Sequence, residues 1–367
     1  MNKKIGILTF HRALSYGAML QAYALQNFMW ELGIENEIVD YNCKYMVDHY
    51  QKNFRKTYGN PIKGFAWNLM TLKGIKKERI TRNTFVNSHL KLSKGYSAVT
   101  IKSAKDSYSA FISGSDQVWS PTCVGFDPVY FLTFANPCQK YSYSASIATK
   151  TIPENLKEEY KKRLSDFQMY SVREQSGAEI VKDLTGKDAF VNIDPTLLLS
   201  KNQWDKLATD VLNEPYIFLF TVHKPKNLIN YALELSQKTG LKVIYLNKFK
   251  SVKHKNLQYL DPVTADKFVG LIKNAKYVCT NSFHGTAFSV IYHKNFVVET
   301  DTCKGKNIRS EELLKSLGLE KQILNSEGFI NIDHKSDWNY VEEKLNEERK
   351  KSENYLLSIQ QQIKGAP

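Results

Sequence analysis

The sequence predicts an α/β protein with two lobes, each built around a parallel β-sheet. Short runs rich in β-branched and aromatic residues alternate with longer runs of helical period along nearly the whole chain, which is the pattern of βαβ units. A chain of 367 residues is also too long for one ordinary core. Because 42% of its residues are hydrophobic, it can build two cores, and a disordered chain is excluded as a class.

The first lobe is predicted from a series of strand-like runs and one clear helix. Apolar residues from Ala18 to Leu32 recur at helical spacing and stop at Gly33, a favourable residue at a helix end. We expect this helix to pack on a first sheet. The predicted strands of that sheet are residues 4–10, 36–41, 110–114, 140–146, 169–173 and 190–193.

A second series of strands and helices predicts a compact Rossmann-like lobe. Asp194-Pro195-Thr196 closes the first series and the polar segment 212–215 opens the second, so a domain boundary is expected near 196–215. The expected strands are 216–222, 242–246, 277–280 and 296–299, and the expected helices are 226–238, 264–273 and 285–292.

We therefore divide the chain into three parts. Residues 1–200 form an N-terminal Rossmann-like domain with a basic helical insertion near 46–95, and residues 201–335 form a C-terminal Rossmann-like domain. Residues 336–367 carry apolar side chains at helical spacing after Asp337, a suitable N-cap. We expect this last helix to pack back on the N-terminal lobe.

Charge indicates the kind of partner. The net charge of +14 favours anionic partners, and residues 52–94 hold much of the excess, with Glu78 as their one acid. The apolar residues of this segment could rest on an anionic membrane. Helices of an insertion that pack against the rest of the protein would explain them equally well. Nucleic acid is disfavoured, because no nucleic-acid-binding motif accompanies the charge.

The same sequence indicates a compartment. It has no apolar stretch of the roughly 20 residues that would cross a membrane, and no signal-like start. Its five cysteines are widely spaced and form no C-x-x-C pair, which argues against disulfides and a zinc site. We expect a cytoplasmic protein, free or at the inner face of the membrane, with reduced thiols.

The segment 279–289 carries the strongest chemical signal. It follows an apolar strand and opens a helix of small residues, so its backbone N–H groups and the positive helix end form a natural anion site. His284 at this turn could donate a hydrogen bond to a phosphate or transfer a proton near neutral pH. A structural histidine held by the backbone fits the local pattern equally well.

A basic loop follows this segment. Arg309 offers a planar guanidinium that can hold a carboxylate or phosphate, whereas Lys304 and Lys306 could support it only as point charges. A solvated loop is the simpler interpretation for the two lysines.

In the first lobe, the strand at 110–114 leads into a Gly/Ser turn. Asp116 and Gln117 could hold sugar hydroxyls, Asp116 could act as a general base, and Trp119 could stack on a sugar ring. The structural alternative is that Asp116 caps a helix and Trp119 fills the core.

The loop after the first strand is the usual ligand-binding loop of a doubly wound sheet. It lacks the G-x-G-x-x-G fingerprint, which argues against NAD or FAD, and we expect Ser15, Tyr16 and Gly17 to line a cleft between the lobes. Arg173 either reaches this cleft or pairs with Glu174 or another nearby acid.

Six motifs in order resemble the polysaccharide pyruvyl transferase family. Between residue 5 and about residue 320 they are Ser-Tyr-Gly-Ala at 15–18, Ser-Gly-Ser-Asp-Gln-Val-Trp at 113–119, Ser-Tyr-Ser-Ala-Ser at 142–146, Ser-Val-Arg-Glu at 171–174, Asp-Pro-Thr-Leu-Leu at 194–198 and Thr-Asn-Ser-Phe-His-Gly-Thr-Ala-Phe-Ser at 280–289. Ser15 stands where the family often has Asn.

The resemblance implies a fold similar to glycosyltransferase-B enzymes, with a cleft between two lobes. It also implies transfer of a pyruvyl group from phosphoenolpyruvate to two hydroxyls of a sugar in a bacterial-type cell-surface polysaccharide or exopolysaccharide, which forms a ketal. The acceptor would be a sugar or a lipid-linked oligosaccharide. Phosphoenolpyruvate is the co-substrate, and no metal or cofactor is expected.

The family's donor-site histidine matches His284, and its basic residue in the following loop matches Arg309, with Lys304 or Lys306 as alternatives. The other roles are predictions from the residues themselves. His284 and Asp116 would be catalytic. The C-terminal lobe would bind the donor through Asn281, Ser282, His284, Gly285, Thr286 and Arg309. The N-terminal lobe would bind the acceptor through Ser15, Tyr16, Gly17, Ser115, Asp116, Gln117, Trp119 and Arg173.

Two other functions stay open on the sequence. One is a nucleotide-sugar-dependent glycosyltransferase of the same two-lobed fold, because a fold does not fix a function. The other is a non-catalytic protein that binds anionic glycans through residues 52–94.

Overall fold

The computed structural model describes residues 4–45, 76–123, 126–247, 254–300, 308–324 and 332–365. The chain divides into two compact units: residues 1–198 with 348–367 form unit 1, and residues 199–347 form unit 2. Much of the predicted basic insertion, together with Lys304 and Lys306, lies outside the described residues.

Unit 1 is built on parallel strands. In its described part, a four-stranded sheet has the order β2-β1-β3-β4, and a separate pair is formed by β5 and β6. Isolated bridges from Tyr141 to Met169 and from Ala145 to Val172 join this pair to the end of β4. The strands are β1 (Ile5–Leu8), β2 (Asn36–Ile38), β3 (Ala110–Ser113), β4 (Lys140–Ser142), β5 (Ser171–Val172) and β6 (Phe190–Val191).

The predicted single first sheet is therefore interrupted between β4 and β5. Ser144 has a φ of 49°, in the left-handed region, so the extended conformation of β4 stops before it. The predicted strand 140–146 is correspondingly shorter in the structure.

Helices complete unit 1. The predicted first helix is α1 (Tyr16–Glu31), and Gly33 follows its end with a φ of 70°, a conformation that glycine adopts without strain. The other helices are residues 76–89, α4 (Lys157–Leu164) and α5 (Gln175–Thr185), together with the 3-10 segments η1 (Thr100–Ser107), η3 (Pro128–Phe131), η4 (Pro137–Gln139), η5 (Glu154–Leu156) and η6 (Pro195–Leu197).

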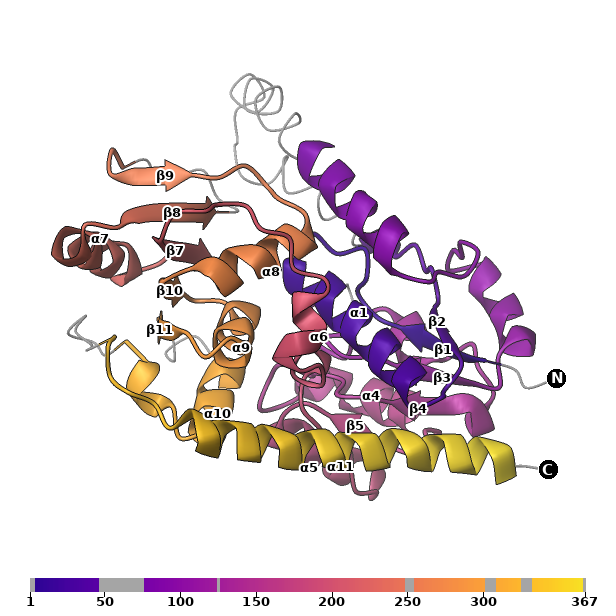
Figure 1. Cartoon of the computed structure of the whole chain (residues 1–367). Helices are drawn as coiled ribbons and strands as arrows, with labels where there is room; N and C mark the ends of the chain where they lie inside the picture. Colours follow the sequence, from indigo (N-terminus) through magenta and orange to yellow (C-terminus); the bar gives the residue numbers. More distant parts are fainter. Residues whose placement is uncertain are drawn as a thin grey trace, which may run out of the picture. The chain divides into compact units, whose positions relative to one another are not determined.

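Unit 2 has a five-stranded sheet in its described part, all parallel, with the order β11-β10-β7-β8-β9. Figure 1 shows α7 on one side of this sheet and α8 and α9 on the other. The strands are β7 (Tyr216–Thr221), β8 (Lys242–Asn247), β9 (Leu257–Tyr259), β10 (Tyr277–Thr280) and β11 (Asn295–Val298). The helices are α6 (Lys201–Asp205), α7 (Leu228–Thr239), α8 (Ala265–Asn274), α9 (Phe283–Ile291), α10 (Ile308–Ser316) and the short η8 (Glu320–Gln322).

In the described residues, the strand order of the four-stranded and of the five-stranded sheet reverses direction once. In unit 2 the chain runs from β7 to β8 on one side and from β10 to β11 on the other, so the loops after β7 and β10 leave in opposite directions. In unit 1 the same reversal lies between β1 and β3. Ligands of open α/β sheets bind outside the carboxyl ends of the strands at such a point. The topology therefore marks one candidate position in each unit.

The last helix, α11 (Trp338–Gly365), contributes residues to both units. Its second half is fixed to unit 1: the Tyr355 hydroxyl donates to the Ser142 carbonyl at 2.8 Å, and the Arg349 side chain donates to the Leu197 carbonyl at 2.9 Å. Across the residues that the structure describes, no helix is long and apolar enough to span a membrane.

Candidate active site

The turn between β10 and α9 is held by short side chains. Ser282 is the N-cap of α9, and its hydroxyl accepts a hydrogen bond from the Gly285 N–H at 3.3 Å. The Thr280 hydroxyl donates to the Phe220 carbonyl and accepts from the Ser282 N–H. A Cβ at Gly285 would lie 2.4 Å from Thr280 Oγ1, so only glycine fits this close approach.

His284 lies in the first turn of α9 and is 8% exposed. Its ring meets the Phe283 ring edge-on, with centroids 5.1 Å apart. Arg309, in the first turn of α10, has its guanidinium 5.4 Å from the centroid of the same Phe283 ring. Phe283 therefore brings together the two residues that the sequence analysis paired as the donor-binding histidine and arginine.

Two residues predicted to bind the donor do something else. The Asn281 side chain is bonded to the backbone after β7: Oδ1 accepts from the Val222 N–H at 2.8 Å, and Nδ2 donates to the His223 carbonyl at 3.0 Å. Thr286 is fully buried, and its hydroxyl donates to the Ser282 carbonyl. In the structure both side chains therefore position the turn.

The loop that follows β7 was not predicted to be part of the site. Residues His223, Lys224 and Lys226 of this loop are exposed. The Glu299 carboxylate, directly after β11, accepts hydrogen bonds from the backbone N–H groups of Lys226, Asn227 and Leu228 at 2.5 to 3.1 Å. The signal was present as the run His-Lys-Pro-Lys after a predicted strand, in the position where doubly wound sheets bind ligands.

In unit 1, the loop after β1 begins with an ionic cluster. The Arg12 side chain donates two hydrogen bonds to the Asp40 carboxylate, and His11 Nε2 lies 3.0 Å from Asp40 Oδ1. Burial alone would raise the pKa of Asp40, but hydrogen bonds with Arg12 and His11 outweigh it and hold this pKa well below its ordinary value. The predicted acceptor residues follow: Ser15 is exposed, Tyr16 half-buried and Gly17 buried.

The turn after β3 presents two polar side chains. Asp116 has a φ of 80°, which is rare outside glycine, and its Oδ1 accepts from the Gln117 N–H at 2.8 Å. The Asp116 carbonyl accepts from the N–H groups of Val118 and Ser146. Asp116 and Gln117 are half-buried, so they remain candidates for contact with an acceptor.

Trp119 does not have the predicted role. Its side chain is fully buried, stacks on Phe131 with ring centroids 5.9 Å apart, and donates from Nε1 to the Tyr130 carbonyl. No face of the indole is left for a sugar. The structural alternative, in which Trp119 fills the core, is the one that the structure shows.

Arg173 and Ser115 are also buried in this protein. Arg173 pairs with Asp194 at 2.9 Å and donates to the Ser115 hydroxyl. Asp194 in turn accepts from the N–H and the hydroxyl of Thr196. Arg173 therefore takes the ion-pair alternative, with Asp194 as its partner, while Glu174 accepts a hydrogen bond from the Ser146 hydroxyl. Arg173 and Ser115 therefore support the Asp116 turn from within the core.

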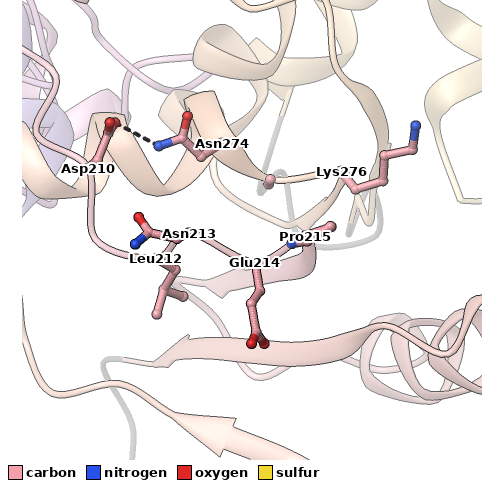
Figure 2. A pocket seen from close by; sticks show the side chains of 8 residues that line it. Asp210, Leu212, Asn213, Glu214, Pro215, Asn274 and Lys276 are labelled. Atoms are coloured by element: carbon pink, nitrogen blue, oxygen red, sulfur yellow. Dashed lines mark hydrogen bonds between the residues drawn. The ribbon is translucent and has the colours of Figure 1, made fainter.

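A pocket of about 420 Å³ lies elsewhere on unit 2 (Figure 2). It is lined by Asp210 and by residues 212–215 and 274–276, and Asn274 Nδ2 donates to Asp210 Oδ1 at 2.7 Å. Residues 215 and 276 directly precede β7 and β10, so the pocket lies at the amino ends of these strands. His284 follows their carboxyl ends, and this pocket is therefore separate from the candidate active site.

Comparison with solved structures identifies the type of fold. Three solved structures are similar over nearly their whole length. A putative UDP-N-acetylglucosamine 2-epimerase from Listeria monocytogenes has a TM-score of 0.53 and 12% identity, and the match covers 97% of this chain and 91% of that chain. UDP-N-acetylglucosamine 2-epimerase from Rickettsia bellii has a TM-score of 0.52 and 12% identity, with 98% and 96% covered, and UDP-GlcNAc 2-epimerase from Methanocaldococcus jannaschii has a TM-score of 0.50 and 15% identity, with 98% and 99% covered. At these identities the likeness shows the fold alone, which is of the glycosyltransferase-B type.

The family follows from the sequence. The model of the family described as polysaccharide pyruvyl transferase matches residues 16–300, which is most of the chain. The protein therefore belongs to the polysaccharide pyruvyl transferase family, as the order of its motifs predicted. No curated protein matches the sequence.

Proposed function

We propose that this protein transfers the pyruvyl group of phosphoenolpyruvate to two hydroxyls of a sugar in a cell-surface polysaccharide or exopolysaccharide, and so forms a pyruvate ketal. The observation that carries the proposal is the association of His284 with Arg309 through Phe283, beside the point where the unit 2 sheet reverses its winding. Membership of the pyruvyl transferase family supports the pyruvyl group as the one transferred.

The donor would bind at the start of α9. Phosphoenolpyruvate carries a phosphate and a carboxylate, and a helix N-terminus stabilises such groups through its backbone N–H groups and its dipole. Arg309 would hold one anionic group through its planar guanidinium. His284, the second residue of α9, would contact the phosphate or the enol carbon.

The chemistry requires proton transfer but no redox step. The enol CH₂ carbon takes a proton and becomes the methyl group, while one sugar hydroxyl attacks the electron-poor central carbon. The C–O bond to phosphate then breaks, a second hydroxyl attacks the same carbon, and its proton leaves with the phosphate. We assign His284 as the acid or phosphate stabiliser and Asp116 as the base for the acceptor hydroxyl.

The acceptor and the compartment are part of the proposal. The acceptor would be a sugar or a lipid-linked oligosaccharide that meets Ser15, Tyr16, Asp116 and Gln117 in unit 1. A multiply charged donor such as phosphoenolpyruvate does not cross a bilayer unaided, because burying its charges is too costly. The reaction would therefore take place on the side where the donor is made, in the cytoplasm or at the inner face of the membrane.

Calorimetry with phosphoenolpyruvate tests the proposal. The native protein should bind phosphoenolpyruvate. In His284→Ala and in Arg309→Ala the affinity should fall by about tenfold or more, since each variant removes a contact to an anionic group. A panel of nucleotide sugars is titrated in parallel. Binding of a nucleotide sugar without binding of phosphoenolpyruvate would contradict the proposal and favour a glycosyltransferase. Activity is then followed as phosphate release and as a new ketal methyl signal in the NMR spectrum of the acceptor.

A further inference from the structure

The loop after β7 forms the other wall of the candidate donor site. β7 and β10 are adjacent, parallel strands, and the loops that follow them leave in opposite directions. The turn with His284 follows β10, so residues 222–228 lie across the reversal point from it. A ligand at the carboxyl ends of these two strands would meet both loops.

The backbone of this loop is fixed at both ends. At its start, the Asn281 side chain bonds to the Val222 N–H and to the carbonyl of His223. At its end, the Glu299 carboxylate accepts from three successive backbone N–H groups, at residues 226–228. Asn281 is 3% and Glu299 8% exposed, so both contacts are shielded from water. A loop fixed in this way loses little conformational entropy when it binds a ligand.

The Glu299 carboxylate also occupies the backbone N–H groups that a ligand could otherwise bind. The start of α7 would otherwise be an anion site of its own, but its backbone N–H groups already bind a carboxylate. An anionic ligand would therefore contact the side chains of the loop. These are the exposed His223, Lys224 and Lys226.

We infer that His223, Lys224 and Lys226 bind the second anionic group of the donor, while the His284 turn binds the first. This inference rests on the proposed function: the loop would share with Arg309 the anionic group that the His284 turn does not hold. Lysine suits this task as a mobile point charge, and histidine can donate a hydrogen bond from its ring. Asn281 and Glu299 act as positioning residues for the loop.

The test compares two double variants by calorimetry with phosphoenolpyruvate. Lys224→Met with Lys226→Met neutralises the loop, and Lys267→Met with Lys276→Met makes the same charge change at exposed lysines of α8 and at the amino end of β10. We expect the loop variant to bind about tenfold more weakly or worse, and the control to stay within about twofold of the native protein. His223→Gln should also weaken binding.

Competition identifies the bound group. Inorganic phosphate and pyruvate are titrated against phosphoenolpyruvate with the native protein and the loop variant. Loss of competition by phosphate would place the phosphate at the loop, and loss of competition by pyruvate would place the carboxylate there. Either result supports the inference.

The two proposals fail in different ways. If the native protein binds phosphoenolpyruvate and the loop variant binds it as well as the control does, the inference on the loop is wrong and the proposed function stands. If the native protein binds no phosphoenolpyruvate, the proposed function fails, and the inference fails with it. Circular dichroism of each variant checks that the fold is retained.

Discussion

Arg173 and Asp194 form an ion pair at 2.9 Å in which the two side chains are 4% and 0% exposed. The pair links the Ser-Val-Arg-Glu and Asp-Pro-Thr-Leu-Leu motifs, and Arg173 extends it to the Ser115 hydroxyl beside Asp116. A buried pair of this kind adds little net stability compared with apolar residues, but removing one partner leaves an uncompensated charge. The three motifs therefore support one turn of the candidate acceptor site.

Replacing Arg173 should destabilise unit 1 strongly. Arg173→Met leaves the Asp194 carboxylate buried without its counter-charge, so we expect a loss of about 3–5 kcal/mol in the free energy of unfolding. Lys182→Met, which breaks an ion pair whose side chains are 53% and 91% exposed, should cost less than about 1 kcal/mol. Urea denaturation measures both. Equal losses in the two variants would show that the buried pair has no special role.

Gly285→Ala should distort the turn that carries His284. The added Cβ would lie 2.4 Å from Thr280 Oγ1, so α9 must shift, at a cost of about 1–3 kcal/mol. Binding of phosphoenolpyruvate should weaken in parallel. Gly95→Ala is the matched control, because no atom lies within 4 Å of the place that its Cβ would take. Thermal unfolding and calorimetry measure the two effects, and a Gly285→Ala protein with native stability and binding would refute this account.

Glu299→Ala should release the start of α7. Loss of the carboxylate leaves three backbone N–H groups without this acceptor, which should cost about 1–2 kcal/mol. Hydrogen exchange at residues 226–228 should become faster. Glu234→Ala, at an exposed position within α7, should leave exchange at these amides unchanged. Unchanged exchange in Glu299→Ala would mean that the loop is held by other contacts.

The Asp40 cluster predicts a specific dependence on pH. Folding lowers the pKa of the Asp40 carboxyl from its ordinary value of 3.8. The ionised carboxylate therefore stabilises the fold at a pH above 3.8, and this contribution is lost as the pH falls toward the pKa of the folded protein. The stability difference between the native protein and Asp40→Asn should therefore be constant at neutral pH and should shrink below about pH 4. Urea titrations between pH 7 and pH 3 measure it. A difference that stays constant over this range would contradict the assignment.

The strands and helices could be predicted because their signals are local. Tyr277–Thr280 is rich in β-branched and aromatic residues, and it is β10 with the predicted bounds. β9 was missed because Leu257–Tyr259 is three residues long and exposes Gln258 and Tyr259, so it has no clear period. The end of β4 was misplaced because the left-handed conformation of Ser144 has no signature in a serine.

The site could be predicted in part for the same reason. His284 and Arg309 were predicted because each stands in a local pattern that suits anions, and the structure brings both to Phe283. The partners of Arg173 and Asn281 are distant in the sequence, at Asp194 and at residues 222–223, and only the fold brings them together. Trp119 was misjudged because a turn residue and a core residue look alike until burial is known.

The course of α11 has a consequence for how the chain is made. Tyr355 is buried in unit 1 and donates to Ser142, yet it follows all of unit 2 in the sequence. During synthesis, the surface of unit 1 at β4 and β6 therefore stays uncovered until residues 199–347 have been made and the second half of α11 can pack on it. Domains made first usually fold first. Here the second unit can complete its core before the first, because the first still lacks the part of α11 that covers it.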